Sequence, residues 1–205
     1  MLTTRQLTLW RGYRCLFEDL QFEIGSGRVG VVRGPNGSGK TTLLRVLAGL
    51  TRAETGEVLW RGQNIEADRA GFGAQMAYLG HATGLKADLT PEQNLDFARR
   101  LGRGAADDEA ATWTALDLDA IRTLPVRYLS AGQQRRVALA RLLNSTADLW
   151  LMDEPLTNLD ARGRAFVSAS LARHLQRGGA AVVATHSELD LPDTDCVAVQ
   201  LGEAA

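Results

Sequence analysis

Apolar and polar residues alternate in the first quarter of the chain. Residues 7–10 and 20–24 follow this two-residue period, which predicts two strands of an antiparallel element. Residues 57–60 and 63–65 have the same character on either side of an Arg-Gly turn, and so predict a β-hairpin. We therefore expect an antiparallel β portion in the N-terminal part of the chain.

Elsewhere, short apolar runs alternate with helical patterns. Residues 28–32, 149–152 and 182–185 predict buried strands, and residues 42–48 predict an amphipathic helix. This order is typical of an α/β protein with a parallel sheet. We expect one domain over residues 1–205.

A helical insert is predicted at approximately residues 88–128. It begins where Thr90 caps a helix whose first residue is Pro91, and Gln93 completes a capping box. Helical patterns continue to about residue 124, with a loop at residues 102–108. The insert lies between strands of the expected α/β core.

A phosphate-binding loop connects the predicted strand 28–32 to the predicted helix 42–48. The octapeptide matches the pattern G-x-x-x-x-G-K-[ST] in full. Its glycines allow a tight turn whose amides face a phosphate, and the helix N-terminus adds further donors. A lysine supplies a mobile cation, and a threonine hydroxyl can bind magnesium. The candidate ATP-binding residues are Gly34, Pro35, Asn36, Gly37, Ser38, Gly39, Lys40, Thr41 and Thr42.

Composition indicates an ordinary water-soluble chain. The net charge is −1, 45% of the residues are hydrophobic, and acidic and basic residues are interspersed, so we expect no nucleic-acid partner. No run of about 18 apolar residues predicts a membrane span, and no signal peptide is expected. Cys15 and Cys196 have no metal-site spacing. We expect a cytoplasmic location.

Two carboxylates and a histidine follow predicted strands. Asp153 is placed to hold Mg²⁺ opposite Thr41, and Glu154 to orient or deprotonate an attacking water. A strand that ends in Asp-Glu is often only structural. His186 follows another strand, where side chains project toward a nucleotide, although a lone histidine is usually structural.

A second helix begins after Ser130. It offers either a Ser-x-x-Gln capping box alone or a second phosphate-binding N-terminus, with Ser130 and the Gly132 amide as donors. The turn at residues 155–160 ends at Asp160 and could be a simple connector.

Together these motifs resemble the ATP-binding-cassette (ABC) ATPases over essentially the whole chain. The resemblance implies a P-loop core with an antiparallel β subdomain and an inserted helical subdomain. It also implies a head-to-tail homodimer that sandwiches two Mg-ATP, with catalysis by Lys40, Glu154 and His186. In the family's terms, the signature motif is Ser130, Ala131, Gly132 and Gln133, and it faces the nucleotide bound by the partner subunit. Asp160 belongs to the D-loop.

Two positions depart from the family pattern, and the residue that stacks on adenine has two candidates. Ala131 stands where the family usually has glycine, and His81 stands at the position of the Q-loop glutamine. A direct contact of His81 with nucleotide or metal is left open. Tyr13 is the candidate for stacking on adenine, with Arg11 in the alternative position and simple packing of Tyr13 as the other reading.

Within that family, residues 129–141, 79–81 and 84–86 resemble the ATP-binding subunits of bacterial cytochrome c biogenesis, the haem-exporter ATPases. This resemblance implies integral membrane permease subunits and a peripheral location on the cytoplasmic face of the inner membrane. Hydrolysis would be coupled to haem export or to release of a haem-loaded chaperone. The chain has no haem-ligand motif, so we expect no haem bound by it. The alternatives are an exporter of drugs, lipids or peptides, and a non-transport cassette acting on DNA or ribosomes.

Overall fold

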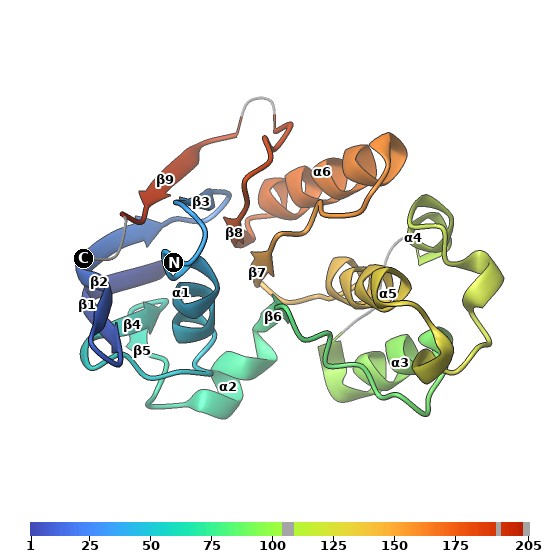
Figure 1. The fold of residues 1–205 in the computed structure, drawn as a ribbon, viewed down its shortest axis with the longest axis horizontal. Helices are drawn as coiled ribbons and strands as arrows, with labels where there is room; N and C mark the ends of the chain where they lie inside the picture. Colours follow the sequence, from blue (N-terminus) through green and yellow to red (C-terminus); the bar gives the residue numbers. More distant parts are fainter. Residues whose placement is uncertain (104–108, 192–193, 203–205) are drawn as a thin grey trace.

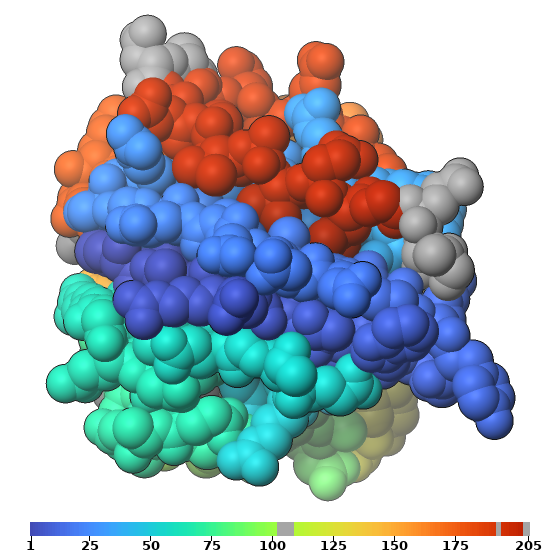
Figure 2. Space-filling model, turned by 90° about the vertical axis from the view of Figure 1, so that its left-hand side faces the viewer, coloured from blue at the N-terminus to red at the C-terminus, as the bar shows by residue number. Residues whose placement is uncertain are grey.

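Two sheets of different kinds lie side by side in the computed structural model, which describes residues 1–103, 109–191 and 194–202 (Figure 1). The first sheet is antiparallel and has the order β2-β1-β4-β5. Its strands are β1 (Leu2–Arg11), β2 (Arg14–Ile24), β4 (Thr55–Trp60) and β5 (Gln63–Asn64). Figure 2 shows the outer face of this half, where the N-terminal strands lie between the C-terminal segment and residues around β4 and β5.

The second sheet is parallel and carries the core of the molecule. Its order is β6-β7-β8-β3-β9. The strands are β3 (Val29–Arg33), β6 (Met76–Leu79), β7 (Leu149–Asp153), β8 (Ala180–Ala184) and β9 (Cys196–Gln200).

Helices cover both faces of the parallel sheet. Val29 and Val31 pack in one buried cluster with residues of α5 (Ala131–Leu143) and α6 (Ala161–Gln176). Val32 faces the other way and joins a cluster with α1 (Lys40–Leu47) and the antiparallel sheet. A parallel sheet buried on both faces has near-continuous apolar strands, which is the pattern of residues 29–32.

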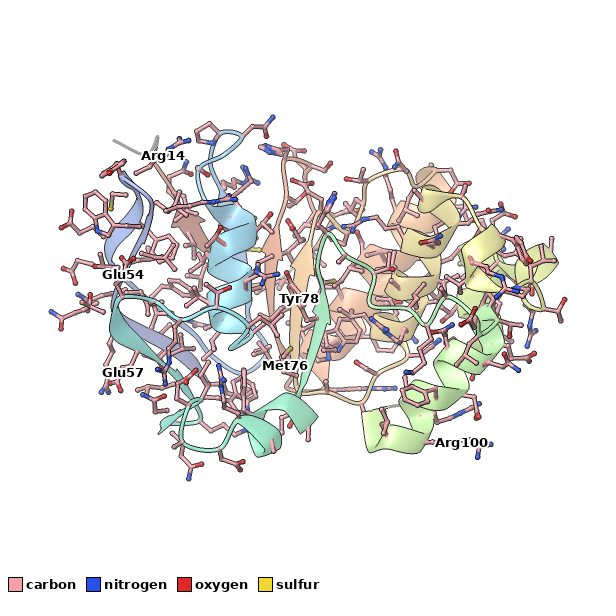
Figure 3. The ribbon with its side chains drawn as sticks, turned by 60° about the horizontal axis from the view of Figure 1, so that its bottom comes forward. Arg14, Glu54, Glu57, Met76, Tyr78 and Arg100 are labelled. Atoms are coloured by element: carbon pink, nitrogen blue, oxygen red, sulfur yellow. The ribbon has the colours of Figure 1, made fainter. Side chains whose placement is uncertain are left out.

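The helical part lies at the opposite end of the molecule from β1 and β2 (Figure 1). The predicted capping box at its start is confirmed, because the Thr90 hydroxyl accepts from Gln93 N at 3.2 Å and Gln93 Oε1 accepts from Thr90 N at 3.0 Å. Arg100 lies in this part, far from the antiparallel sheet (Figure 3). The elements are α3 (Pro91–Ala98), a π-helical turn (Arg99–Arg103), α4 (Glu109–Ala115) and two 3₁₀ turns (Asp119–Ile121 and Val126–Tyr128).

Most predicted elements are confirmed; β1, β2 and β4 are longer than expected, and β5 ends one residue earlier than expected, at Asn64. The loop prediction is wrong at residues 102 and 103, because the π-helical turn extends to Arg103; the rest of that prediction, residues 104–108, lies outside the described residues. The sequence pattern missed β6, β9 and the short helix α2 (Arg69–Ala74). The strand β6 has four residues and β9 is an edge strand, so neither has the long buried run that identifies a central strand.

Within the described ranges, no helix combines the length and the apolar character that a membrane crossing needs. Cys15 and Cys196 are both free thiols.

Candidate active site

The loop between β3 and α1 has the backbone that a phosphate site requires. Gly34, Gly37 and Gly39 have φ values of 155°, 79° and 96°, a region that favours glycine. A Cβ on Gly34 would lie 2.6 Å from the Leu201 carbonyl oxygen. Gly39 is the N-cap of α1, and no side chain of a described residue caps this helix. Its first amides are therefore available to an anion.

Lys40 is folded back over this loop. Its Nζ donates to the Gly34 carbonyl at 2.7 Å and to the Pro35 carbonyl at 3.0 Å, and the residue is only 9% exposed. An ammonium group has three donors, so one N–H remains after these two bonds. The loop thus holds a cation beside the free amides.

Thr41 and Asp153 meet although 112 positions separate them in the sequence. The Thr41 hydroxyl donates to Asp153 Oδ2 at 2.8 Å, and Asp153 is 6% exposed at the end of β7. Hydroxyl and carboxylate oxygens are the ligands that Mg²⁺ prefers, so this pair fits that ion.

Glu154 has a strained backbone and an unsatisfied carboxylate oxygen. Its φ is 47°, and its amide donates to the Ala184 carbonyl at 2.8 Å, which fixes it beside β8. A non-glycine residue in this region costs about 1–3 kcal/mol and persists only where the surroundings impose it. Its Oε1 is buried and has no hydrogen-bond partner among the described residues, while His186 Nε2 lies 3.7 Å away. An unpaired carboxylate beside an imidazole suits proton transfer or the orientation of a water.

These groups line one pocket of about 590 Å³ at the carboxyl ends of β3, β7 and β8. Ligands of open α/β sheets bind at this edge. Arg11 is the alternative to Tyr13 for the position beside adenine. Arg11 is in the lining and Tyr13 is not. The lining residues are Arg11, Leu16, Asn36, Gly37, Gly39, Lys40, Thr41, Thr42, Asp153, Glu154, Thr157, His186 and Ser187.

Gly34, Pro35 and Ser38 of the phosphate loop are not in this lining, and neither are Tyr13, His81 and Asp160. Tyr13 is fully exposed in the turn between β1 and β2, and His81 is exposed just after β6. Asp160 caps α6, since its carboxylate accepts from Gly163 N at 2.7 Å. In the isolated chain, Asp160 therefore has a structural partner, and Tyr13 and His81 are on the surface.

The start of α5 forms the predicted capping box. The Ser130 hydroxyl accepts from Gln133 N at 3.2 Å, and Gln133 Oε1 accepts from Ser130 N at 2.8 Å. Ser130 and Ala131 are exposed, and a Cβ on Gly132 would meet no atom within 4 Å. These residues do not line the pocket of their own chain. The capping role is confirmed, and the exposed helix start is open to another molecule.

One residue of α5 contacts the site although the sequence did not indicate it. Arg135 donates to the carbonyls of Asp153 and Glu154, and nothing in a helical arginine signals this long-range contact. Nearby on β6 lies Tyr78, next to Met76 in the labelled view (Figure 3). Burial, followed by the charge of Asp153, raises the pKa of the Tyr78 phenol, which therefore stays neutral near pH 7.

Comparisons with known proteins identify relatives over most of the chain. Residues 17–157 match the family model described as ABC transporter. The chain is 47% identical over 192 residues to the cytochrome c biogenesis ATP-binding export protein CcmA of Yersinia pestis bv. Antiqua, covering 92% of this chain and 87% of the relative. It is 42% identical to the protein of the same name from Vibrio cholerae, over 99% of both chains.

Solved structures show the same fold. An ATP-binding subunit of an ABC transporter has a TM-score of 0.81 at 21% identity, covering 91% of this chain and 79% of that one. A dimeric ATP-binding cassette in a post-hydrolysis state, bound to ADP and Pi, has a TM-score of 0.77 at 24% identity, covering 91% and 88%.

Proposed function

The chain belongs to the ABC transporter family and, within it, to the cytochrome c biogenesis ATP-binding export proteins, and from this premise we propose how its site hydrolyses ATP and what the hydrolysis drives. It is an ABC-type ATPase with a P-loop α/β fold. The observation that carries the assignment of the site is one pocket lined by the phosphate loop, Asp153, Glu154 and His186.

In the proposed mechanism, the loop amides and Lys40 bind the β- and γ-phosphates of ATP. Thr41 and Asp153 would hold Mg²⁺, which neutralises phosphate charge when bound. Glu154 orients the attacking water and accepts its proton, and His186 donates a hydrogen bond to the γ-phosphate. The short distance between Glu154 and His186 supports these linked roles.

We propose that two copies form a head-to-tail homodimer that sandwiches two ATP molecules. Ser130, Ala131, Gly132 and Gln133 of one copy would face the phosphates bound by the other, with Asp160 near the same interface. The exposed start of α5, open above Gly132, supports this arrangement. The same two patches then meet twice, as twofold symmetry requires. The assignment of residues 1–205 to one ATPase domain, with a helical insert at approximately 88–128, is part of this proposal.

We further propose that the dimer binds integral membrane permease subunits at the cytoplasmic face of the bacterial inner membrane. Its hydrolysis would drive haem export or release of a haem-loaded chaperone, without haem bound by this chain and without a nucleic-acid partner. The names of the relatives, which state cytochrome c biogenesis and export, support this role.

Replacement of Glu154 by Gln tests the site. Glu154→Gln keeps the shape of the side chain and removes the base, so ATP still binds while turnover falls by about 10²–10⁴-fold. We expect ATP to trap this variant as a dimer in size-exclusion chromatography with light scattering. The control is Glu92→Gln, since Glu92 lies on the helical part and pairs with Arg122. Near-normal turnover of Glu154→Gln would contradict the assignment.

The partners are tested by isolating the chain in mild detergent from its own cells. Mass spectrometry should find small membrane subunits, and the absorption spectrum should show haem in a co-purifying chaperone. A different permease would refute the haem-related role and leave the ATPase chemistry intact.

A further inference from the structure

Arg135 on α5 joins the ends of two strands of the parallel sheet. Its Nη1 donates to the Gly80 carbonyl at 2.9 Å, just after β6. Its Nη2 donates to the Glu154 carbonyl at 3.2 Å and also to the Asp153 carbonyl, at the end of β7. One guanidinium therefore reaches three backbone acceptors on two segments, which its planar fork allows.

These bonds complete the restraint of Glu154. Its amide is held by the Ala184 carbonyl, and its carbonyl is held by Arg135, so both peptide units of this left-handed residue have fixed partners. The carboxylate direction depends on these peptide planes. Arg135 also lies five residues after Ser130 on one continuous helix.

We propose that Arg135 is a positioning residue that ties the end of β6 to the end of β7, aims the Glu154 carboxylate, and links the start of α5 to the catalytic carboxylate of the same subunit. The consequence for turnover rests on the proposed function, whereas the link between the strands does not. In the proposed dimer, Ser130 contacts a phosphate that is bound in the partner's site. Through Arg135, this contact affects Glu154 of the subunit that carries Ser130.

Arg141 provides a matched control on the same helix. Its guanidinium also bonds two backbone carbonyls, those of Thr83 and Gly84, each at 2.8 Å. It is not part of the pocket lining at Glu154. The variants are Arg135→Gln, Arg135→Lys and Arg141→Gln. Lysine keeps the charge without the fork, and it also gives a second folded variant if glutamine impairs folding.

The first measurement is hydrogen–deuterium exchange of the whole chain without nucleotide, followed by mass spectrometry. We expect Arg135→Gln to raise exchange in peptides that contain residues 80–81 and 153–155 together, whereas Arg141→Gln raises it near residues 83–84. The link would be overturned if both Arg135 variants exchange at residues 80–81 and 153–155 at the same rate as the unmutated chain.

The second measurement is steady-state ATP hydrolysis. Arg135→Gln should lower kcat by about 10- to 100-fold with KM within twofold, because a small displacement of a catalytic group is costly in rate. Arg135→Lys should recover less than half of the loss, and Arg141→Gln should keep kcat. Full recovery by lysine, or an equal loss in Arg141→Gln, would overturn the positioning role.

The two measurements separate this inference from the proposed function. If the unmutated chain does not hydrolyse ATP but Arg135→Gln still raises hydrogen–deuterium exchange, the proposed function is refuted and the link between the strands remains supported. Normal hydrolysis by both Arg135 variants would refute the positioning role alone.

Discussion

Lys40→Ala removes the one cation that the structure places on the phosphate loop within the described part of the chain. The ammonium bonds the carbonyls of Gly34 and Pro35, at 2.7 and 3.0 Å, and retains one donor for a ligand. The variant removes both the loop contacts and the charge next to the bound phosphate. Both ATP affinity and turnover should fall.

The magnitude follows from two opposing terms. Two unit charges about 4 Å apart attract by about 4 kcal/mol at an effective dielectric constant of about 20. To pair with the phosphate, the third N–H of the ammonium gives up a hydrogen bond to water, and a charged hydrogen bond contributes about 1.5–3 kcal/mol. The difference is about 1–2.5 kcal/mol, which is about a 5- to 60-fold loss of ATP affinity. Turnover falls further, by about 10²–10³-fold, because charge moves on the phosphate oxygens in the transition state.

Titration calorimetry with Mg-ATP measures the affinity, and a phosphate-release assay measures turnover. The chain has a second lysine, Lys86, whose Nζ lies 4.5 Å from the centre of the Phe97 ring, away from the pocket. Lys86→Ala is therefore the control and should bind ATP normally. A dissociation constant for Lys40→Ala within twofold of the unmutated chain, or an equal loss in Lys86→Ala, would refute the reasoning.

Three further predictions concern the dimer, pH and the Q-loop position. Ser130→Arg should abolish hydrolysis while ATP still binds each monomer, since the larger side chain at the exposed start of α5 blocks the proposed dimer. Hydrolysis at the normal rate would rule out the shared site. Burial lowers the pKa of His174, which stacks on Trp150 with ring centres 4.0 Å apart. The unfolded chain therefore binds more protons below about pH 6.5, so the melting temperature should fall as the pH drops from 7 to 5.5. His174→Phe should flatten that slope, and an unchanged slope would assign the effect to other groups. His81→Gln should change ATP turnover or cytochrome c yield if the histidine is specialised; if neither changes, His81 has no specialised role.

The sequence predicted the local parts of the site. The glycines at 34, 37 and 39 encode the loop by themselves, because only their backbone freedom permits its φ values. The capping boxes at Thr90 and Ser130 could also be predicted from the sequence, since each involves two residues that are three positions apart. The likeness of the motifs to the ABC ATPases supplied the family, which the comparisons confirmed.

Contacts between distant segments could be predicted only where a motif at each segment pointed to the same ligand. The placement of Asp153 opposite Thr41 was anticipated from the phosphate loop and from a strand that ends in two carboxylates, and the structure gives the two side chains a hydrogen bond of 2.8 Å. Arg11 in the pocket lining, with Tyr13 exposed outside it, depends on how the turn between β1 and β2 is placed over the loop. Arg11 and Tyr13 are only two positions apart, so the sequence does not decide which of them lies in the pocket.

The chain by itself determined the phosphate loop, the alternation of buried strands and helices, and the helix starts, because these depend on backbone conformation and on residues close in sequence. Only the tertiary structure decided that Arg135 bonds the backbone at Gly80 and Glu154, and that a carboxylate oxygen of Glu154 remains unpaired beside His186. These features arise from packing α5 and β8 against β7, since that packing places groups from distant positions within bonding distance.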